Sequence, residues 1–179
     1  MKKKITLAVI CAVLSCVCLI GTTFAWLTDT TATITNTFTV GNVDIDLTET
    51  TGDEYKLIPG TEYAKNPTVI VEANSETCWL FVKVVKTNNP DAYLDYSLNL
   101  TGWTELTADS GIYYREVATS GSNQSFELIT GNKVTVKTSV TKANIEAIGA
   151  NYPTISFTAY AAQKSGLTVQ QAWDLFTAP

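Results

Sequence analysis

The chain of 179 residues is predicted to form an all-β fold, an antiparallel sandwich or barrel that carries a short C-terminal helix. Two observations predict the strands. Short segments alternate apolar with polar residues or are apolar throughout, and turn signals rich in Gly, Asn and Pro separate them about every ten residues. A third observation predicts the helix, because the last segment has apolar residues at helical spacing.

The chain begins with the pattern of a secretory signal peptide, residues 1–25. Lys2 to Lys4 form the basic n-region, and the apolar run from Ile5 to Ile20 forms the h-region. Thr23 and Ala25 then supply small residues at the −3 and −1 positions. We expect a signal peptidase to cut between Ala25 and Trp26.

Two other uses of this segment stay open. The apolar run has 16 residues, fewer than the ~20 of a spanning helix, but an extension to Leu27 would make it an uncleaved anchor. Cys16 weakly resembles a lipidation site, although Val17 to Ile20 continue the apolar run where a lipidated cysteine would close it. Contact with a membrane is therefore expected only through the uncleaved signal.

Residues 26–40 form an expected N-terminal arm, which is a candidate donor strand. Threonines at the odd positions from Thr31 to Thr39 are β-branched and favour extended backbone. Apolar residues at even positions share the opposite face of such a strand. The expected contact residues of this assembly arm are Trp26, Leu27, Ile34, Phe38 and Val40.

Residues 41–179 are expected to fold as one β domain. Alternation of apolar and polar residues predicts most of its strands, and the segment from Cys78, which is apolar on both faces except at Lys83, predicts a central strand. The turns expected between strands are Leu57–Gly60, Asn88–Asp91 and Thr130–Asn132, the last in a hairpin, and Trp103–Leu106 is expected to pair back on the strand before it. The expected strands are Val43–Leu47, Thr68–Val71, Cys78–Val85, Leu94–Leu100, Trp103–Leu106, Ile112–Val117, Phe126–Ile129, Val134–Val140 and Ile155–Ala161.

Two helical segments are expected near the C-terminus. Ala143–Ile148 is predicted to make one helical turn that ends at Gly149. Thr168 and Gln171 have the spacing of a capping box for a final helix. Its apolar stripe comprises Val169, Ala172, Trp173 and Phe176, and we expect this helix to cover one end of the core with Trp173 and Phe176 buried.

Composition argues against catalysis and against nucleic-acid binding. Loss of the signal lowers Lys+Arg from 12 to 9 against 17 Asp+Glu, which gives a net charge of −8, and Arg115 is the single arginine. The chain has no histidine, so a zinc-peptidase H-E-x-x-H motif cannot occur, and Cys78, the one cysteine outside the signal, is expected to be buried and inert. No catalytic, cofactor or metal residue is expected. Calcium is an alternative for the carboxylates Asp44, Asp46, Glu49, Asp53 and Glu54, but their spacing matches no calcium loop, and a solvated strand face is the usual explanation.

Three stretches carry a family resemblance. TFAWLTDTTATITNTFTVGNVDIDLTE (Thr23 to Glu49), Leu57 to Val85 and Ile155 to Gln163 resemble the TasA/camelysin-like exported proteins of Gram-positive bacteria. This resemblance implies a jelly-roll β-sandwich, export through a signal peptidase of the SipW type, and assembly into extracellular fibres of a biofilm matrix. The camelysin name also carries a metalloprotease label, which the absence of histidine makes doubtful for this chain.

Two functions follow from these expectations. The first is a secreted structural protein of the matrix or cell surface that self-associates into fibres by donating its arm. The second is a monomeric, adhesin-like module without enzymatic activity, whose arm folds back as its own edge strand.

Overall fold

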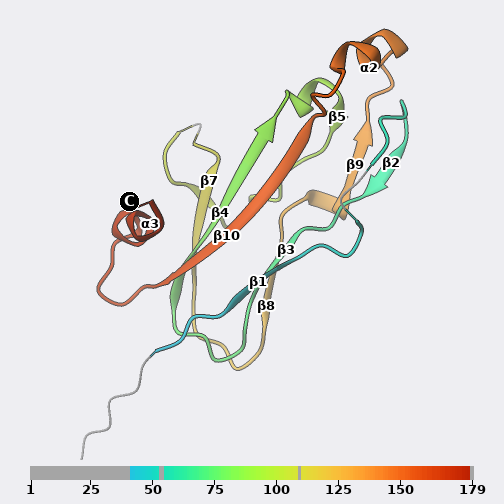
Figure 1. Cartoon of the computed structure of the whole chain (residues 1–179). Coiled ribbons are helices and arrows are strands. Elements are labelled where there is room, and N and C mark those ends of the chain that lie inside the picture. The colour runs from blue at the N-terminus through green and yellow to red at the C-terminus, as the bar shows by residue number, and fades with distance from the viewer. Residues whose placement is uncertain (1–40, 53–54, 109, 178–179) are drawn as a thin grey trace, which may run out of the picture. The chain divides into compact units, whose positions relative to one another are not determined.

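The computed structural model describes residues 41–52, 55–108 and 110–177 (Figure 1). Ten strands and three sheets occur in these residues, and every strand pairing is antiparallel. The strands are β1 (Ile45–Thr48), β2 (Glu62–Ala64), β3 (Thr68–Val71), β4 (Cys78–Thr87), β5 (Leu94–Asp95), β6 (Thr104–Glu105), β7 (Ile112–Val117), β8 (Gln124–Glu127), β9 (Lys133–Val136) and β10 (Thr154–Gln163). The helices are the 3₁₀ turns η1 (Pro90–Ala92) and η2 (Thr130–Asn132), together with α2 (Lys142–Ile148) and α3 (Val169–Thr177).

The sheets form two layers. One layer is the sheet β10-β4-β7-β6. The other consists of the sheets β1-β3-β8 and β2-β9-β5, between which backbone hydrogen bonds continue, from Leu128 N to Pro67 O at 2.9 Å and from Lys65 N to Asn132 O at 2.8 Å. The domain is thus an all-β sandwich with a short C-terminal helix, as predicted.

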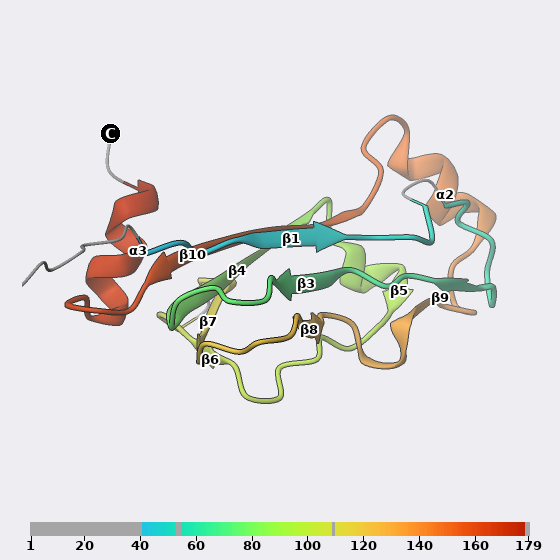
Figure 2. The same cartoon turned by 90° about the horizontal axis from the view of Figure 1, so that it is seen from below.

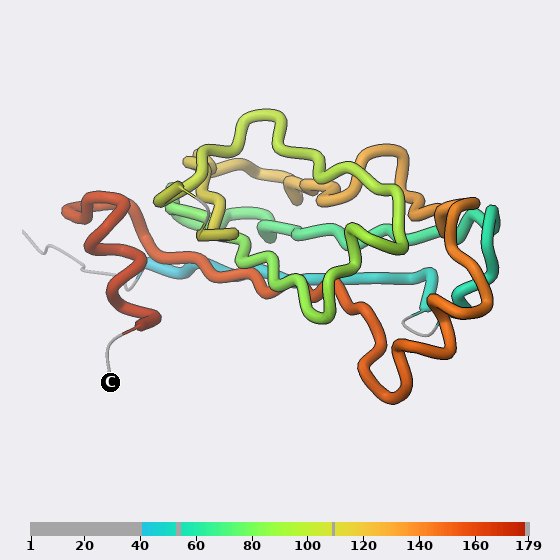
Figure 3. The backbone as a smooth tube through the Cα atoms, turned by 90° about the horizontal axis from the view of Figure 1, so that it is seen from above, coloured from blue at the N-terminus to red at the C-terminus, as the bar shows by residue number. Residues whose placement is uncertain are grey.

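Strand β4 lies at the centre of the molecule and has a buried residue on both faces, which confirms the prediction from its sequence. Cys78, Leu80 and Val82 face the other layer, where they join Val69 and Val71 of β3 in the core. The opposite face of β4 carries Trp79 and Phe81, which pack under α3 in a second cluster. The tube in Figure 3 shows α3 at one end of the long strand β10.

The expected strand Leu94–Leu100 was wrong in extent. Only Leu94 and Asp95 are strand, and an isolated bridge pairs Leu98 with Ile129. Leu94 pairs with Val136 and Leu98 pairs with Ile129. Four residues along this segment therefore correspond to seven residues along the partner segment. The three residues of η2 account for the excess, because they leave the line of the partner strand and interrupt the ladder.

The expected hairpin at Thr130–Asn132 was also wrong. β8 pairs with β3, while β9 pairs with β2 and β5, so η2 is a corner that carries the chain from one small sheet to the next. Strand β9 ends at Val136 instead of Val140, because the chain turns after Lys137, where the Val140 N–H donates to Lys137 O at 3.2 Å.

The expected pairing of Trp103–Leu106 with the preceding segment was wrong as well. β6 pairs forward with β7, with Thr104 opposite Tyr114 and Glu105 opposite Tyr113. The Leu106 N–H donates to Ile112 O across the connecting turn, so this segment forms a hairpin with the strand that follows it and not with the one before it.

The helix expected at the C-terminus is present and capped as predicted. The Gln171 N–H donates to Thr168 Oγ1 at 3.3 Å, and the Thr168 N–H donates to Gln171 Oε1 at 2.9 Å. Trp173 is 8% exposed, but Phe176 is 37% exposed, which corrects the expectation that both rings are buried. The helix lies on the outer face of β4 and β10 and does not cover the end of the core between the layers, because that face carries the ring of Phe81.

Candidate assembly site

Two edge strands of the sandwich lie side by side. In the part of the chain that the structure describes, β1 pairs only with β3 and β10 pairs only with β4. β1 and β10 contact each other across the layers, and Figure 2 shows β1 running alongside β10. An edge strand presents N–H and C=O groups that a further strand can pair with.

The space between these edges is apolar, and we call it the β1/β10 seam. Its residues come from both edges and are only half-buried, although they pack on side chains of β3 and β4 that are at most 2% exposed. An added strand would therefore cover apolar surface as well as pair backbone groups. The seam residues are Val43, Ile45 and Leu47 on the β1 side and Phe157, Ala159 and Ala161 on the β10 side.

The opposite side of the sandwich is closed by a cation–π stack. The guanidinium of Arg115 lies 4.1 Å from the ring centre of Phe126 and 5.4 Å from that of Trp103. The two rings meet edge to face at 6.2 Å, which joins the β6–β7 hairpin to β8. Burial lowers the pKa of Arg115, but an arginine stays charged in proteins.

The chain enters β1 at one end of the seam and is held firmly there. The Asp44 N–H donates to Ser75 Oγ at 3.1 Å, and the same hydroxyl donates to Asp44 O at 3.2 Å. The Glu76 N–H donates to Asn42 O at 2.9 Å, and Gly41 lies against the side chains of Glu76 and Gln163. These contacts place the start of the described domain beside the last residue of β10.

The other end of the seam opens into a pocket of about 490 Å³, which we call the end pocket. It lies where the sheet β2-β9-β5 faces the first residues of β10, and its walls are mainly apolar and aromatic. Residues that line it are Tyr55, Lys56, Leu57, Tyr63, Lys65, Leu94, Val134, Val136, Tyr152, Pro153, Thr154 and Ile155.

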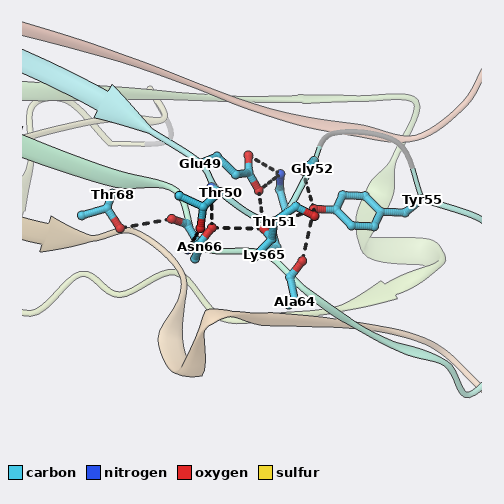
Figure 4. Close-up of polar contacts among 9 residues, drawn as sticks. All are labelled: Glu49, Thr50, Thr51, Gly52, Tyr55, Ala64, Lys65, Asn66 and Thr68. Carbon is cyan, nitrogen blue, oxygen red and sulfur yellow. Dashed lines mark hydrogen bonds and ion pairs between the residues drawn. The ribbon is translucent and has the colours of Figure 1, made fainter.

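A polar network holds one wall of the end pocket in place (Figure 4). Lys65 Nζ lies 2.9 Å from Glu49 Oε1. The Thr50 N–H donates to Asn66 Oδ1 at 3.0 Å. The Tyr55 hydroxyl donates to Gly52 O at 2.6 Å and reaches Ala64 O at 3.1 Å. These bonds fasten the segment after β1 to β2 and the segment after it, so this wall of the pocket is held by contacts within the chain.

The predicted arm and cleavage residues lie outside the described residues. These are Ala25, Trp26, Leu27, Ile34, Phe38 and Val40. Sequence reasoning missed the seam and the end pocket. The alternation of apolar residues from Ile155 to Ala161 indicates an inward face, but it does not show whether this strand lies at the edge or in the middle of its sheet.

The carboxylates considered for calcium do not come together in the described part of the chain. Glu49 pairs with Lys65, and Asp46 is exposed and accepts the Leu47 N–H at 2.8 Å. Asp53 and Glu54 lie outside the described residues. Where side chains are described, no group of three or more His, Cys, Asp or Glu could hold a metal ion.

Cys78 is a buried thiol and not a nucleophile. Its exposed fraction is 0%, and burial raises its pKa to about 11. A thiol with such a pKa carries almost no thiolate near neutral pH. The prediction of a buried cysteine is therefore confirmed.

The fold and the seam define a class of protein: an antiparallel β-sandwich with two adjacent edge strands and an apolar seam between them. Residues 1–73 match the family model described as camelysin metallo-endopeptidase. That match reaches from the expected export signal through the arm to the end of β3, and it supports the resemblance to the TasA/camelysin family. No curated protein and no solved structure matches the chain. In the described ranges no helix is long and apolar enough to cross a membrane.

The residues of this chain do not fit the metal site that the description metallo-endopeptidase implies. The whole sequence lacks histidine, so neither the ligands nor the spacing of H-E-x-x-H can be formed. Cys78 faces the core with a raised pKa and is a poor metal ligand. We therefore derive no proteolytic step from this match.

Proposed function

We propose that this protein is a secreted structural subunit that polymerises into extracellular fibres. Each subunit donates its arm, residues 26–40, to the β1/β10 seam of the next subunit. The observation that carries this proposal is the open seam, whose apolar residues are half-buried between two edge strands. The family match over residues 1–73 supports the resemblance to TasA/camelysin-like proteins. That resemblance in turn implies an exported, structural role at the cell surface or in the matrix of a Gram-positive bacterium.

Favourable assembly needs both the apolar side chains of the arm and its extended backbone. Burying Ile34, Phe38 and Val40 is worth about 1.5–3 kcal/mol each, while association costs about 4–15 kcal/mol. Side-chain burial alone therefore does not guarantee assembly. The extended, threonine-rich backbone adds hydrogen bonds along the edge strand, as in other cases of strand addition.

Donation from one subunit to the next is heterologous and need not close into a ring, so it extends into a filament. Before cleavage the signal holds the arm at the membrane, and after cleavage Trp26 becomes the free end. A signal peptidase of the SipW type would then act as the switch for assembly. No catalytic residue and no cofactor enters this function.

The competing function is a monomeric, adhesin-like module. Its arm would turn at Gly41 and Asn42 and pair with β1 of its own subunit. In that case the seam is filled within one chain, and no surface is left for a neighbour.

Sedimentation and electron microscopy of the mature protein, residues 26–179, test the proposal. We expect fibres from this protein, and their loss in a variant without residues 26–40 whose fold is checked by circular dichroism. Phe38→Asp should abolish assembly, because it places a charge on the apolar face of the arm. Thr37→Asp is the matched control on the opposite face and should still assemble. A mature protein that stays monomeric at high concentration, with its arm protected from proteases, would establish the adhesin-like module instead.

A further inference from the structure

The root of the arm and the end pocket lie at opposite ends of one long ladder. β10 and β4 pair over ten residues, from Thr154 opposite Thr87 to Gln163 opposite Cys78. Gly41 lies against Gln163, while Thr154 and Ile155 line the end pocket. At about 3.3 Å per residue the two sites are about 30 Å apart.

The two ends of the seam differ in how much of the same chain lies there. At the Gln163 end, Gly41 and Glu76 occupy the approach, and Asp44 is fixed there through Ser75. At the Thr154 end the end pocket is open, with Tyr152 66% exposed at its rim. The body of a donor subunit therefore meets less obstruction at the end pocket than at the Gln163 end.

This route fixes the direction of the donated arm. Val40 is joined to the body of the donor, which stays outside the pocket, so the arm runs inward toward its own Trp26. The arm then lies antiparallel to β10, which begins at the pocket and ends at Gln163. An arm that folds back on its own subunit from Gly41 would instead lie parallel to β10. Because antiparallel pairing is the more stable ladder per residue, the donated arm should pair with β10, whereas an arm that folds back should pair with β1.

Length and side-chain parity then suggest a register. The arm has 15 residues and spans about 50 Å when extended, so it covers the seam and leaves about five residues to reach the donor. If Trp26 lies level with Gln163, eight residues further along each strand bring Ile34 level with Ile155. Ile155 is a half-buried residue of the end pocket, and Phe38 follows on the same face of the arm.

We propose that the end pocket is the mouth of the acceptor seam and receives Ile34 and Phe38 of the neighbouring subunit, whose arm lies antiparallel to β10. This inference rests on the proposed function and adds the polarity of the fibre and the residues that meet. The occupant is a second copy of this chain, because the walls are apolar and aromatic and the arm supplies apolar side chains on one face.

Engineered disulfides test polarity and register together. Cys78 is fully buried and does not interfere. In the mature protein, Ile34→Cys with Ile155→Cys should give a ladder of covalent multimers after mild oxidation, read on a non-reducing gel. Thr28→Cys with Ala161→Cys should do the same, because these positions also lie level in the antiparallel register.

The matched controls exchange the partners. Ile34→Cys with Ala161→Cys, and Thr28→Cys with Ile155→Cys, carry the same substitutions but separate the two sulfurs by six residues along the strands. Neither should give a ladder. A ladder from the exchanged pairs, or fibres without a ladder from the matched pairs, overturns the inference and leaves fibre assembly standing. Monomers without any fibre, or cross-links only within one chain, overturn the proposed function as well.

Discussion

At the scale of single residues, glycine positions that the sequence marks only as turn signals differ greatly in importance. Gly111 has a φ of +66°, and a Cβ at this position would lie 2.7 Å from Val84 O. The same glycine accepts the Val84 N–H at 2.8 Å, which ties the turn before β7 to β4. Both its backbone conformation and its space therefore require glycine.

Gly111→Ala should lower the free energy of unfolding by about 2–3 kcal/mol, because the methyl group meets the carbonyl of Val84 and the positive φ is strained for alanine. Urea denaturation measures this change. Gly121→Ala is the control, since a Cβ there has no atom within 4 Å, and it should alter stability by less than about 0.5 kcal/mol. Equal effects of the two substitutions would contradict the close approach.

At the scale of elements, α3 shows how a short helix depends on the sheet beneath it. The ring of Trp173 lies 5.3 Å from that of Phe81 and 5.4 Å, edge to face, from that of Tyr160. Trp79 Nε1 also donates to Leu167 O at 3.1 Å, which fixes the segment before the helix. A helix of nine residues is unstable alone in water, so these contacts hold it in place.

Trp173→Ala should destabilise the domain by about 3–5 kcal/mol, because it removes a large buried ring and leaves a cavity in its cluster. Urea melts of both proteins measure the loss. Leu175→Ala on the same helix is the control, because Leu175 is 61% exposed, and its effect should stay below about 1 kcal/mol. A loss below about 1 kcal/mol at Trp173 would mean that the ring does not anchor the helix.

At the scale of the whole molecule, the two sides of the sandwich differ in how the side chains at their edge strands are covered. Arg115, Trp103 and Phe126 close one side with side chains of the same subunit. The other side ends in two adjacent edges whose inward residues stay half-buried. The second side is therefore the one that the arm would cover, whether it comes from a neighbouring subunit, as we propose, or from the same chain.

Cleavage of the signal peptide should release the arm from the membrane. We expect cleavage between Ala25 and Trp26, because Thr23 and Ala25 place small residues at the −3 and −1 positions after a short apolar run. N-terminal sequencing of secreted protein checks the site. An intact Met1 would show a retained anchor, a terminus at Cys16 would show lipidation, and either would remove the proposed switch.

The sequence alone determined the elements whose cause is local. Apolar segments after turn signals predicted β3 and β7 with their observed bounds, alternation predicted β10 within two residues at each end, and Thr168 with Gln171 specified the capping box of α3. The apolar run from Cys78 identified the central strand, because a strand covered on both faces needs apolar residues at both parities.

Only the tertiary structure decided which strands become neighbours. Thr130–Asn132 has the residues of a hairpin turn, yet β8 and β9 on either side of it join different sheets. The adjacency of β1 and β10, more than a hundred residues apart, and the end pocket beyond them were likewise invisible in the sequence. The physical reason is that side-chain alternation tells a strand which face to bury but not which partner to choose. That choice depends on packing summed over the whole core.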